Sequence, residues 1–421
     1  MPTSVPMRDE GLHSATPAAG LAGAERTLAP VLPGAPGDPR CTLGVIGGGQ
    51  LGRMFVHAAQ AAGYGTVVLD PDPDSPAGAV AGRHLRAAYD DAAALATLAD
   101  ACAAVTTEFE NVPAASLRAL AQRVPVAPSA AAVAVCQHRA REKAFFQRAG
   151  VACAPHAVIE TEADLAAVAP SLFPGVLKTS SLGYDGKGQL RVDSANALAA
   201  AWRQLGGVPC VLEQRLALRH EISVILARGR DGVCVHLPVQ QNLHRDGILA
   251  VTQVPAPDVP VALAAQAVEG AKRLAAAMGY VGVLCVEFFV LADGRLVANE
   301  MAPRPHNSGH YSVDACDVSQ FALQLRTLAG LPLTPPRLHS PALMLNVLGD
   351  LWFAAGTAAT AAVTPPWAEV LALPGAQLHL YGKSEPRPGR KMGHLTVTAA
   401  DAGTAQAVAR QAAQRLGLPA F

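Results

Sequence analysis

The sequence has no long apolar run, few aromatic residues and no excess of charge. Aromatic residues make up 5% and charged residues 16% of the 421 residues, and the formal net charge is zero. A membrane-spanning helix needs about 20 mostly apolar residues, and nucleic-acid binding usually needs a basic surface. We therefore expect neither a membrane nor a nucleic acid as partner. Apolar residues make up 51%, which is enough for a large buried core.

Paired cysteines are also missing. The eight cysteines are scattered, and no two have the C-x-x-C spacing of a zinc or redox site. Isolated thiols are typical of a reducing compartment, where disulfides do not persist, so we expect a cytoplasmic protein. Residues 1–40 are rich in Pro, Ala and Gly and lack the apolar core of a signal peptide. We expect them to be a disordered extension.

Strand and helix patterns divide the rest of the chain into units. The first unit runs from Thr42 to Cys136 and alternates strands with helices, which predicts a parallel sheet covered by helices. Its expected strands are 42–46, 66–70, 104–109 and 124–128, and its first helix is 50–62. Further helices are expected at 138–149, 194–205 and 261–277, a hairpin at 281–300, and further strands at 173–180, 210–216, 221–229, 233–240, 342–347, 377–382 and 394–398.

A glycine motif opens the first unit. In VIGGGQLGRM, Gly47, Gly49 and Gly52 form G-x-G-x-x-G between a strand and a helix, and Asp70 ends the next strand. This pattern is typical of a loop that binds a dinucleotide. It equally fits a sugar phosphate, because free N–H groups at a helix N-terminus attract anions of many kinds. The motif alone leaves both alternatives open.

The segment 281–310 predicts a metal site. Asp293-Gly294 favours a two-residue hairpin turn, so that the residues flanking this dipeptide pair with each other. Counting outward places Glu287 directly opposite Glu300. Opposed side chains have Cβ atoms about 4.5–5.5 Å apart, where two carboxylates repel. Mg²⁺ removes this conflict and prefers carboxylates together with phosphate oxygens. We predict two Mg²⁺ ions here beside a nucleotide, with Mn²⁺ as the alternative ion.

Two further segments carry polar side chains suited to anions. Directly after the hairpin, Arg304, His306 and Asn307 lie within four residues, which predicts a lined pocket. Between two expected strands, LKTSSLGYDGKGQ contains three glycines with Lys178 before them and Lys187 among them. Backbone amides and ammonium groups together form a phosphate cradle that can close as a lid. The spacing of a Walker A loop is absent.

Six motifs together resemble one family. GGGQLGRM (47–54), TEFENVP (107–113), GYDGKGQ (183–189), NLHRDGIL (242–249), NEMAPRPHNSGH (299–310) and RPGRKMGHL (387–395) resemble those of N5-carboxyaminoimidazole ribonucleotide synthases, within the ATP-grasp superfamily. The resemblance covers residues 42–398. It implies an α/β fold, α+β in the grasp part. The implied domains are a Rossmann-like parallel-sheet domain at 41–137, an ATP-grasp region at 138–330 with a lid at about 151–216, and a C-terminal domain at 331–421.

The resemblance also implies an activity. Such enzymes carboxylate 5-aminoimidazole ribonucleotide with bicarbonate during purine synthesis, and they convert ATP to ADP and phosphate. Carboxyphosphate would be the intermediate, and Asp185 would accept the amine proton. The family suggests a homodimer. One departure is Lys187, where the motif commonly has Arg; lysine keeps the charge but loses the bidentate geometry.

Site residues follow from the resemblance by matching positions. The metal ligands are Glu287 and Glu300. The catalytic positions are Asp185, Lys187, Arg304, His306, Asn307 and Lys383. The substrate positions are Gly49, Gln50, Leu51, Arg304, Lys383, Arg390 and Lys391. The ATP positions are Arg139, Lys143, Lys178, Gly183, Tyr184, Asp185, Gly186, Lys187, Gly188, Gln189, Glu213, Gln214, Arg215, Leu216, Glu221, His244, Asn299 and Glu300.

Three other functions stay open at this point. A formate-dependent glycinamide ribonucleotide transformylase is another ATP-grasp ligase and would use the same metal site. An NAD-dependent oxidoreductase would use the glycine motif. A nucleotide-binding protein without catalysis would use the phosphate cradle alone.

Overall fold

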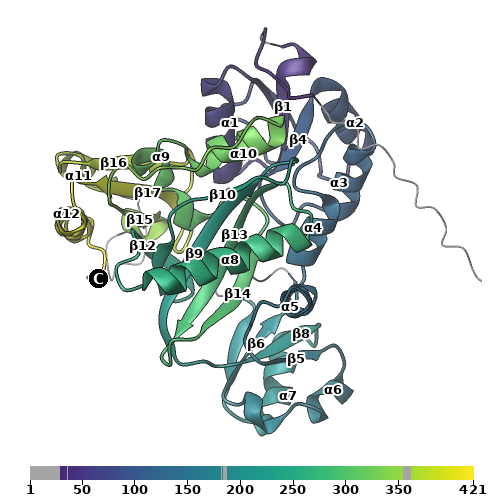
Figure 1. Ribbon diagram of the computed structural model, residues 1–421, viewed down its shortest axis with the longest axis vertical. Coiled ribbons are helices and arrows are strands. Elements are labelled where there is room, and N and C mark those ends of the chain that lie inside the picture. Colours follow the sequence, from purple (N-terminus) through teal and green to yellow (C-terminus); the bar gives the residue numbers. More distant parts are fainter. Residues whose placement is uncertain (1–28, 36, 182, 184–186, 354–361) are drawn as a thin grey trace, which may run out of the picture.

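The computed structural model describes residues 29–35, 37–181, 183, 187–353 and 362–421, and the strands among these residues form three sheets (Figure 1). The first sheet is parallel and has the order β3-β2-β1-β4. Its strands are β1 (Thr42–Ile46), β2 (Gly65–Leu69), β3 (Arg83–Leu85) and β4 (Ala104–Thr107). Its helices are α1 (Gln50–Ala61), α2 (Ala92–Ala101), α3 (Ala114–Ala121) and α4 (Ala130–Cys136). The expected strand at 124–128 is reduced to one bridge between Val126 and Val105.

The second sheet has nine strands and is antiparallel. Its main order is β14-β13-β9-β11-β12-β15-β17-β16, with β10 beside β9. The strands are β9 (Leu218–Arg228), β10 (Cys234–His236), β11 (Gln240–Arg245), β12 (Ile248–Val254), β13 (Gly282–Leu291), β14 (Leu296–Ala302), β15 (Ala342–Leu348), β16 (Ala376–Leu380) and β17 (Lys391–Thr398). The last three strands therefore extend the sheet of the central region instead of forming a separate one.

Helices cover this sheet and join it to the first. They are α8 (Val261–Ala277), α9 (Ser312–Ala315), α10 (Gln320–Ala329), α11 (Trp367–Leu371) and α12 (Ala402–Arg415). In Figure 1, α8 lies across β9 and β13, whereas α10 lies beside α1 of the first domain. Helix α10 begins at Ser319, whose side chain caps it, and ends at Gly330 in the left-handed conformation.

The third sheet forms a small domain at the lower end of the molecule in Figure 1. Its order is β5-β8-β6-β7, from β5 (His156–Ile159), β6 (Gly175–Thr179), β7 (Gln189–Val192) and β8 (Cys210–Gln214). The helices α6 (Glu162–Ala166) and α7 (Ala195–Gln204) pack on it, and α5 (Arg139–Arg148) precedes it in the chain. The glycine-rich loop connects β6 to β7, but Leu182, Tyr184, Asp185 and Gly186 lie outside the described residues.

The hairpin of β13 and β14 reaches its predicted pairing by another route. The Leu291 amide donates to the carbonyl of Arg295 (2.8 Å), so the loop holds three residues, with Gly294 at φ +86°. The predicted two-residue turn is therefore wrong. Asn299 is then an extra residue on β14, a β-bulge between the pairs Phe288–Ala298 and Glu287–Glu300. The bulge restores the register, and the predicted opposition of the two glutamates is confirmed.

Part of the N-terminal extension contacts the folded domains. The Val31 amide donates to the carbonyl of Ala329 (2.8 Å), and the Tyr64 hydroxyl donates to the carbonyl of Val31 (2.8 Å). A short 3₁₀ turn at Pro39–Cys41 then leads into β1, and Asp38 caps it. The predicted end of the disordered extension at residue 40 is therefore too late, because these backbone groups are already paired. Residues 1–28 and 36 lie outside the described residues.

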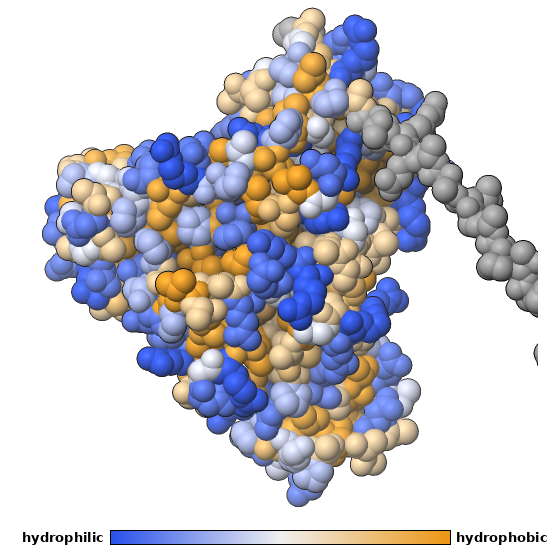
Figure 2. Space-filling model, viewed as in Figure 1, coloured by the Kyte–Doolittle hydropathy of each residue, from blue (hydrophilic) through white to orange (hydrophobic). Residues whose placement is uncertain are grey.

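The visible face of the molecule is mixed in polarity. Figure 2 shows polar and apolar side chains interspersed over the visible face. None of the helices in the described part of the chain combines the length and the hydrophobicity that a bilayer span requires.

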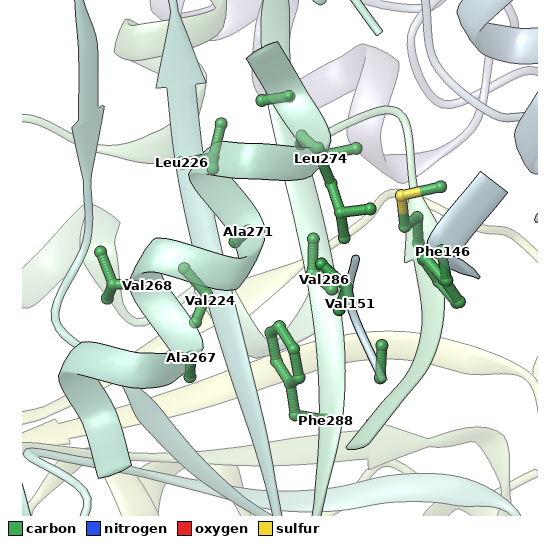
Figure 3. Packing of buried hydrophobic residues seen from close by; sticks show 14 of the residues in the cluster. Phe146, Val151, Val224, Leu226, Ala267, Val268, Ala271, Leu274, Val286 and Phe288 are labelled. Atoms are coloured by element: carbon green, nitrogen blue, oxygen red, sulfur yellow. The ribbon is translucent and has the colours of Figure 1, made fainter. Parts of the chain in front are cut away.

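The largest core cluster lies between α8 and the strands that carry the glutamates (Figure 3). Val224 and Leu226 of β9, Val286 and Phe288 of β13, and Leu274 of α8 are all buried in it. Apolar residues alternate with Glu287 along β13, so one face of the strand packs on α8 while the glutamate points to the other face. The packing thereby fixes where the carboxylate stands.

We predict that Phe288→Ala lowers the free energy of unfolding by about 3–5 kcal/mol, because the ring is only 2% exposed and its removal leaves a cavity. Denaturant unfolding would measure this loss. Val261→Ala is the control: Val261 is 87% exposed, and its truncation should change stability by less than about 0.5 kcal/mol. Equal stability of the two variants would contradict the role of this core.

Candidate functional site

A cavity of about 700 Å³ lies where the first domain, the lid and the large sheet meet. Seven Lys or Arg residues and four Glu residues line it, so its charge favours anionic ligands. The basic residues are Arg139, Lys187, Arg304, Lys383, Arg387, Arg390 and Lys391, and the acidic ones are Glu108, Glu110, Glu142 and Glu300. The cavity thus brings together predicted site residues that are up to about 340 positions apart, since Gln50 and Leu51 line it as well.

The opposed glutamates form the acidic part of the site. Oε1 of Glu287 is buried and has no hydrogen-bond partner among the described residues, and the same holds for Oδ1 of Asn299. Nε2 of His306 lies 3.6 Å from Oε1 of Glu287, beyond hydrogen-bond distance. Buried oxygens without partners are costly, and three oxygen donors at this hairpin fit a hard cation such as Mg²⁺.

The two carboxylates differ in their surroundings. Burial raises the pKa of Glu287, and the negative charge of Glu300 raises it further. Burial acts in the same direction on Glu300, but the positive charges of Arg139 and Lys178 outweigh it and lower the pKa of Glu300. Nη1 of Arg139 lies 3.1 Å from Oε2 of Glu300. A cation between the carboxylates would relieve the remaining repulsion.

A second ion-pair cluster lies at the lid. Glu213 of β8 accepts from Lys178 Nζ (3.0 Å) and pairs with Lys143 Nζ (3.2 Å), and Lys143 also donates to the carbonyl of Asn299 (2.8 Å). Although burial opposes it, the two lysines hold the pKa of Glu213 at about 2. The Glu213 side chain, one of the predicted ATP positions, is paired with both ammonium groups.

Backbone amides of the glycine motif are hydrogen-bonded to carboxylates of the same chain. Glu108 accepts hydrogen bonds from the amides of Gly49 and Leu51, and Asp70 accepts from the amide of Gly48 (2.6 Å). The prediction that these amides are open to a phosphate is therefore wrong. A Cβ atom at Gly49 would clash with Oε1 of Glu108, so a larger residue at position 49 would force this carboxylate to move.

Asp70 is also committed to the fold. Its carboxylate accepts from the amide of Asp72 (2.8 Å) and from the hydroxyl of Tyr89 (2.6 Å), in addition to Gly48. It is buried and points back to the loop, not outward to a ribose. A dinucleotide would therefore find neither free amides in the glycine loop for its pyrophosphate nor a free Asp70 carboxylate for its ribose. Burial raises the pKa of Glu108 to about 7 despite its backbone hydrogen bonds.

Glu110 holds Arg304 in a bidentate ion pair. Nε of Arg304 donates to Oε2 of Glu110 (2.5 Å), and Nη2 donates to Oε1 (3.2 Å). Burial opposes the charge of Glu110, but Arg304 lowers its pKa. This pair joins the first domain to the end of β14, 194 residues later in the chain. Sequence reasoning missed Glu110 as a site residue, although TEFENVP was the signal.

His306 and Asn307 play different parts. Nδ1 of His306 bonds the hydroxyl of Ser308 (2.8 Å), and its amide donates to Gln320 (2.8 Å). Burial and the charge of Arg304 hold the pKa of His306 well below its ordinary value, so the ring is neutral. Both polar atoms of the Asn307 side chain are buried and unpaired among the described residues. Asn307 therefore presents one donor and one acceptor to the cavity.

The C-terminal strands supply most of the positive charge. Lys383 follows β16 and donates to the carbonyl of Lys391 (2.7 Å), and Arg390 donates to the carbonyl of Glu385 (2.7 Å). Arg387 also lines the cavity and was missed from the sequence, although it opens the quoted motif RPGRKMGHL. Clustered guanidinium and ammonium groups suit a phosphate.

The remaining predicted residues lie around the nucleotide side. Glu221 and His244 line a second cavity of about 360 Å³, where His244 Nδ1 is 2.8 Å from Oε2 of Glu221. Burial opposes protonation of His244, but Glu221 raises its pKa. Gly183 lines the main cavity; Gly188, Gln189, Gln214, Arg215 and Leu216 lie on or beside the lid sheet. Tyr184, Asp185 and Gly186 lie outside the described residues.

Three family models match the chain. They are described as the Ribonucleotide synthetase preATP-grasp domain (residues 40–137), the ATP-grasp domain (144–321) and the Phosphoribosylaminoimidazole carboxylase C-terminal domain (342–408). These matches bear out the predicted fold class: an α/β ATP-grasp protein with a parallel-sheet domain before the grasp region and a further domain after it.

Individual relatives agree with the family models. The N5-carboxyaminoimidazole ribonucleotide synthase of Brucella melitensis is 44% identical over 361 residues, which cover 85% of this chain and 96% of the relative. That of Bacillus subtilis is 38% identical over 359 residues, 85% of this chain and 91% of the relative.

Solved structures are similar as well. The ADP complex of an N5-carboxyaminoimidazole ribonucleotide synthetase has a TM-score of 0.83 at 36% identity, covering 91% of this chain and 98% of that one. The Aspergillus clavatus enzyme, solved with ADP and 5-aminoimidazole ribonucleotide, has a TM-score of 0.80 at 32% identity and covers 89% and 98%. The chain therefore belongs to the N5-carboxyaminoimidazole ribonucleotide synthase family of ATP-grasp enzymes.

Proposed function

We propose that this chain carboxylates 5-aminoimidazole ribonucleotide with bicarbonate, giving N5-carboxyaminoimidazole ribonucleotide, ADP and phosphate. The observation that carries the proposal is the opposition of Glu287 and Glu300, of which Glu300 lines the cationic cavity. Two relatives' structures bound to ADP, one of them also with 5-aminoimidazole ribonucleotide, support the choice of ligands. The related formate-dependent transformylase is disfavoured, because the Brucella melitensis and Bacillus subtilis relatives are N5-carboxyaminoimidazole ribonucleotide synthases.

Glu287, Glu300 and the side chain of Asn299 would hold Mg²⁺. The unpaired buried oxygens of Glu287 and Asn299, and the position of Glu300 directly opposite Glu287, support this assignment. When bound, this ion supplies charge neutralisation to the phosphates of ATP. Arg139 already pairs with Glu300 and extends from α5 into the cavity, so it can contact the same phosphates. Two Mg²⁺ ions, or Mn²⁺ in their place, are part of the proposal.

ATP would lie between the lid sheet and the large sheet. Lys143 and Lys178 stand at this boundary, and Glu213 holds both ammonium groups in position. Glu221 and His244 border the second cavity on the same side, which suits the nucleoside end of ATP. The glycine-rich loop, with Lys187, would close over the phosphates and exclude water.

The ribonucleotide would bind at the other end of the cavity. Because Glu108 and Asp70 occupy the amides of the glycine loop, the phosphate needs other partners. Lys383, Arg390 and Lys391 line the cavity and provide them. Gln50 and Leu51 face the same space and would contact the sugar, not the phosphate.

Bicarbonate would bind between these two substrates. Arg304 is fixed by Glu110, and the amide of Asn307 has both polar atoms available. A bicarbonate oxygen attacks the γ-phosphoryl group, giving ADP and carboxyphosphate. The amine then attacks the carbonyl carbon and phosphate leaves. Asp185 remains our candidate for accepting the amine proton, and neutral His306 helps to hold the geometry beside Glu287.

We also propose that the enzyme acts as a homodimer in the cytoplasm. The family resemblance supports the dimer. All eight cysteines are free, and five of them are buried, which is consistent with a reducing compartment.

We predict that phosphate release from ATP requires both bicarbonate and 5-aminoimidazole ribonucleotide for full rate. A coupled ADP assay would measure it. Formate with glycinamide ribonucleotide should give no product, and NADH should not bind, because the glycine loop is filled by carboxylates. Activity with formate and glycinamide ribonucleotide alone would contradict the proposed function.

We predict that Glu287→Gln and Glu300→Gln each lower kcat at least about 100-fold, a loss of about 3 kcal/mol in transition-state stabilisation. Each amide lacks the charge that balances a divalent ion. Steady-state turnover at saturating ATP would measure the effect. Glu269→Gln, at an exposed position of α8, is the matched control and should keep wild-type activity. Near-wild-type turnover in either site variant would rule out the shared metal site.

We predict that Glu110→Gln raises the KM for bicarbonate about 10-fold and changes kcat less, because Arg304 loses its charged bidentate partner. The exposed pair of Glu385 and Arg387 provides the control, since exposed ion pairs contribute little to stability. Glu385→Gln should leave the bicarbonate KM unchanged. An unchanged bicarbonate KM in Glu110→Gln would show that Arg304 does not bind this substrate.

A further inference from the structure

A second cluster of metal-ligating side chains lies at the junction of the grasp region and the C-terminal strands. It consists of Asp314, His379 and His394, whose ligand atoms all lie within 4.8 Å of one another. None of the three lines either of the cavities assigned above. The cluster therefore requires an explanation separate from the carboxylation site.

Strand register brings the two histidines together. His379 of β16 and His394 of β17 are direct partners in the antiparallel ladder, and their rings stack with centroids 4.6 Å apart. Directly opposed residues point to the same face of a sheet, so the two rings can contact one ion. Asp314 reaches them from α9, and its oxygens lie 2.9 and 3.1 Å from Nε2 of His379. Three separate elements thus converge.

His394 is prepared as a ligand. The residue is 0% exposed, and its Nε2 has no hydrogen-bond partner among the described residues. Its Nδ1 lies 3.0 Å from the hydroxyl of Tyr381. When Nδ1–H donates to that oxygen, Nε2 carries a lone pair, which is the usual outer-shell arrangement of a metal-bound histidine.

We propose that Asp314, His379 and His394 bind one divalent transition-metal ion, and that Zn²⁺ is the best match. Two imidazoles and a carboxylate are ligands that Zn²⁺ accepts at about 2.0–2.2 Å, with water completing the tetrahedron. Binding requires the His379 ring to tilt out of its stack, since a lone pair lies in the ring plane. The His379 side chain is 30% exposed, so the ring borders solvent on one side. The proton shared with Asp314 leaves to solvent.

The ion would stabilise the side of the main cavity that carries Lys383 and Lys391, referred to below as the cationic wall. Lys383 lies three residues beyond the end of β16, and Lys391 begins β17, so both lie on or close to the strands that the ion would clamp to α9. His310 connects the two regions, because it lines the main cavity and its ring centroid is 4.9 Å from that of His394. The effect expected of the ion is stabilisation of this wall, not chemistry.

Titration of the metal-free full-length protein with Zn²⁺ in excess Mg²⁺ tests the proposal. Calorimetry should show one Zn²⁺ per chain, and the ion should raise the melting temperature. Asp314→Asn and His379→Gln should weaken binding at least about 10-fold and abolish the shift, because each removes one of three ligands. Two variants are used so that misfolding of one does not decide the outcome. The melting temperature of each variant without Zn²⁺, compared with that of the metal-free wild type, shows whether it is folded.

Two control variants separate this site from others. His339→Gln changes an exposed histidine near α9, and Glu300→Gln removes a carboxylate of the main site; both should bind Zn²⁺ as the wild type does. Absence of stoichiometric binding would overturn the proposal. Equal affinity in Asp314→Asn and His379→Gln, or loss of binding in Glu300→Gln alone, would overturn it too, because Zn²⁺ would then bind elsewhere.

Discussion

Two carboxylates that face each other across one β-ribbon are the constraint on which the site depends. Glu287 cannot move away from Glu300, because β13 is hydrogen-bonded to β9 on one side and to β14 on the other. Packing of Phe288 and Val286 against α8 fixes which face of the strand carries the carboxylate. The fold therefore maintains a repulsion that a bound cation would relieve, and the folding free energy of the core offsets its cost.

Charge of the opposite sign surrounds this pair and comes from distant parts of the chain. Arg139 and the lysines that flank Glu213 stand on the lid side, whereas Lys383, Arg390 and Lys391 stand on the C-terminal side. A cavity lined by seven basic and four acidic side chains suits two phosphorylated substrates and a metal ion. The small bicarbonate ion fits between them, where the Glu110–Arg304 pair joins two domains.

Local patterns predicted what depends on local chemistry. The alternation along β13, the Asp-Gly turn signal and the glycine-rich loops are readable within about 20 residues, and they gave the hairpin and its opposed glutamates. The turn length was wrong because a left-handed glycine extended the loop, and the bulge at Asn299 cancelled the error. Glu108 and Glu110 were missed because their partners lie 57–59 and 194 residues away, which no local pattern reveals.

The glycine motif shows why one pattern can mislead. A helix N-terminus attracts any anion, and here the anions are carboxylates of the same chain.

The opposed glutamates are a more specific signal, and a crystal structure with Mn²⁺ and a non-hydrolysable ATP analogue tests them most directly. We expect anomalous density for Mn²⁺ bonded to both Glu287 and Glu300 and to phosphate oxygens. Phosphates bound with no metal on either carboxylate would contradict the central claim.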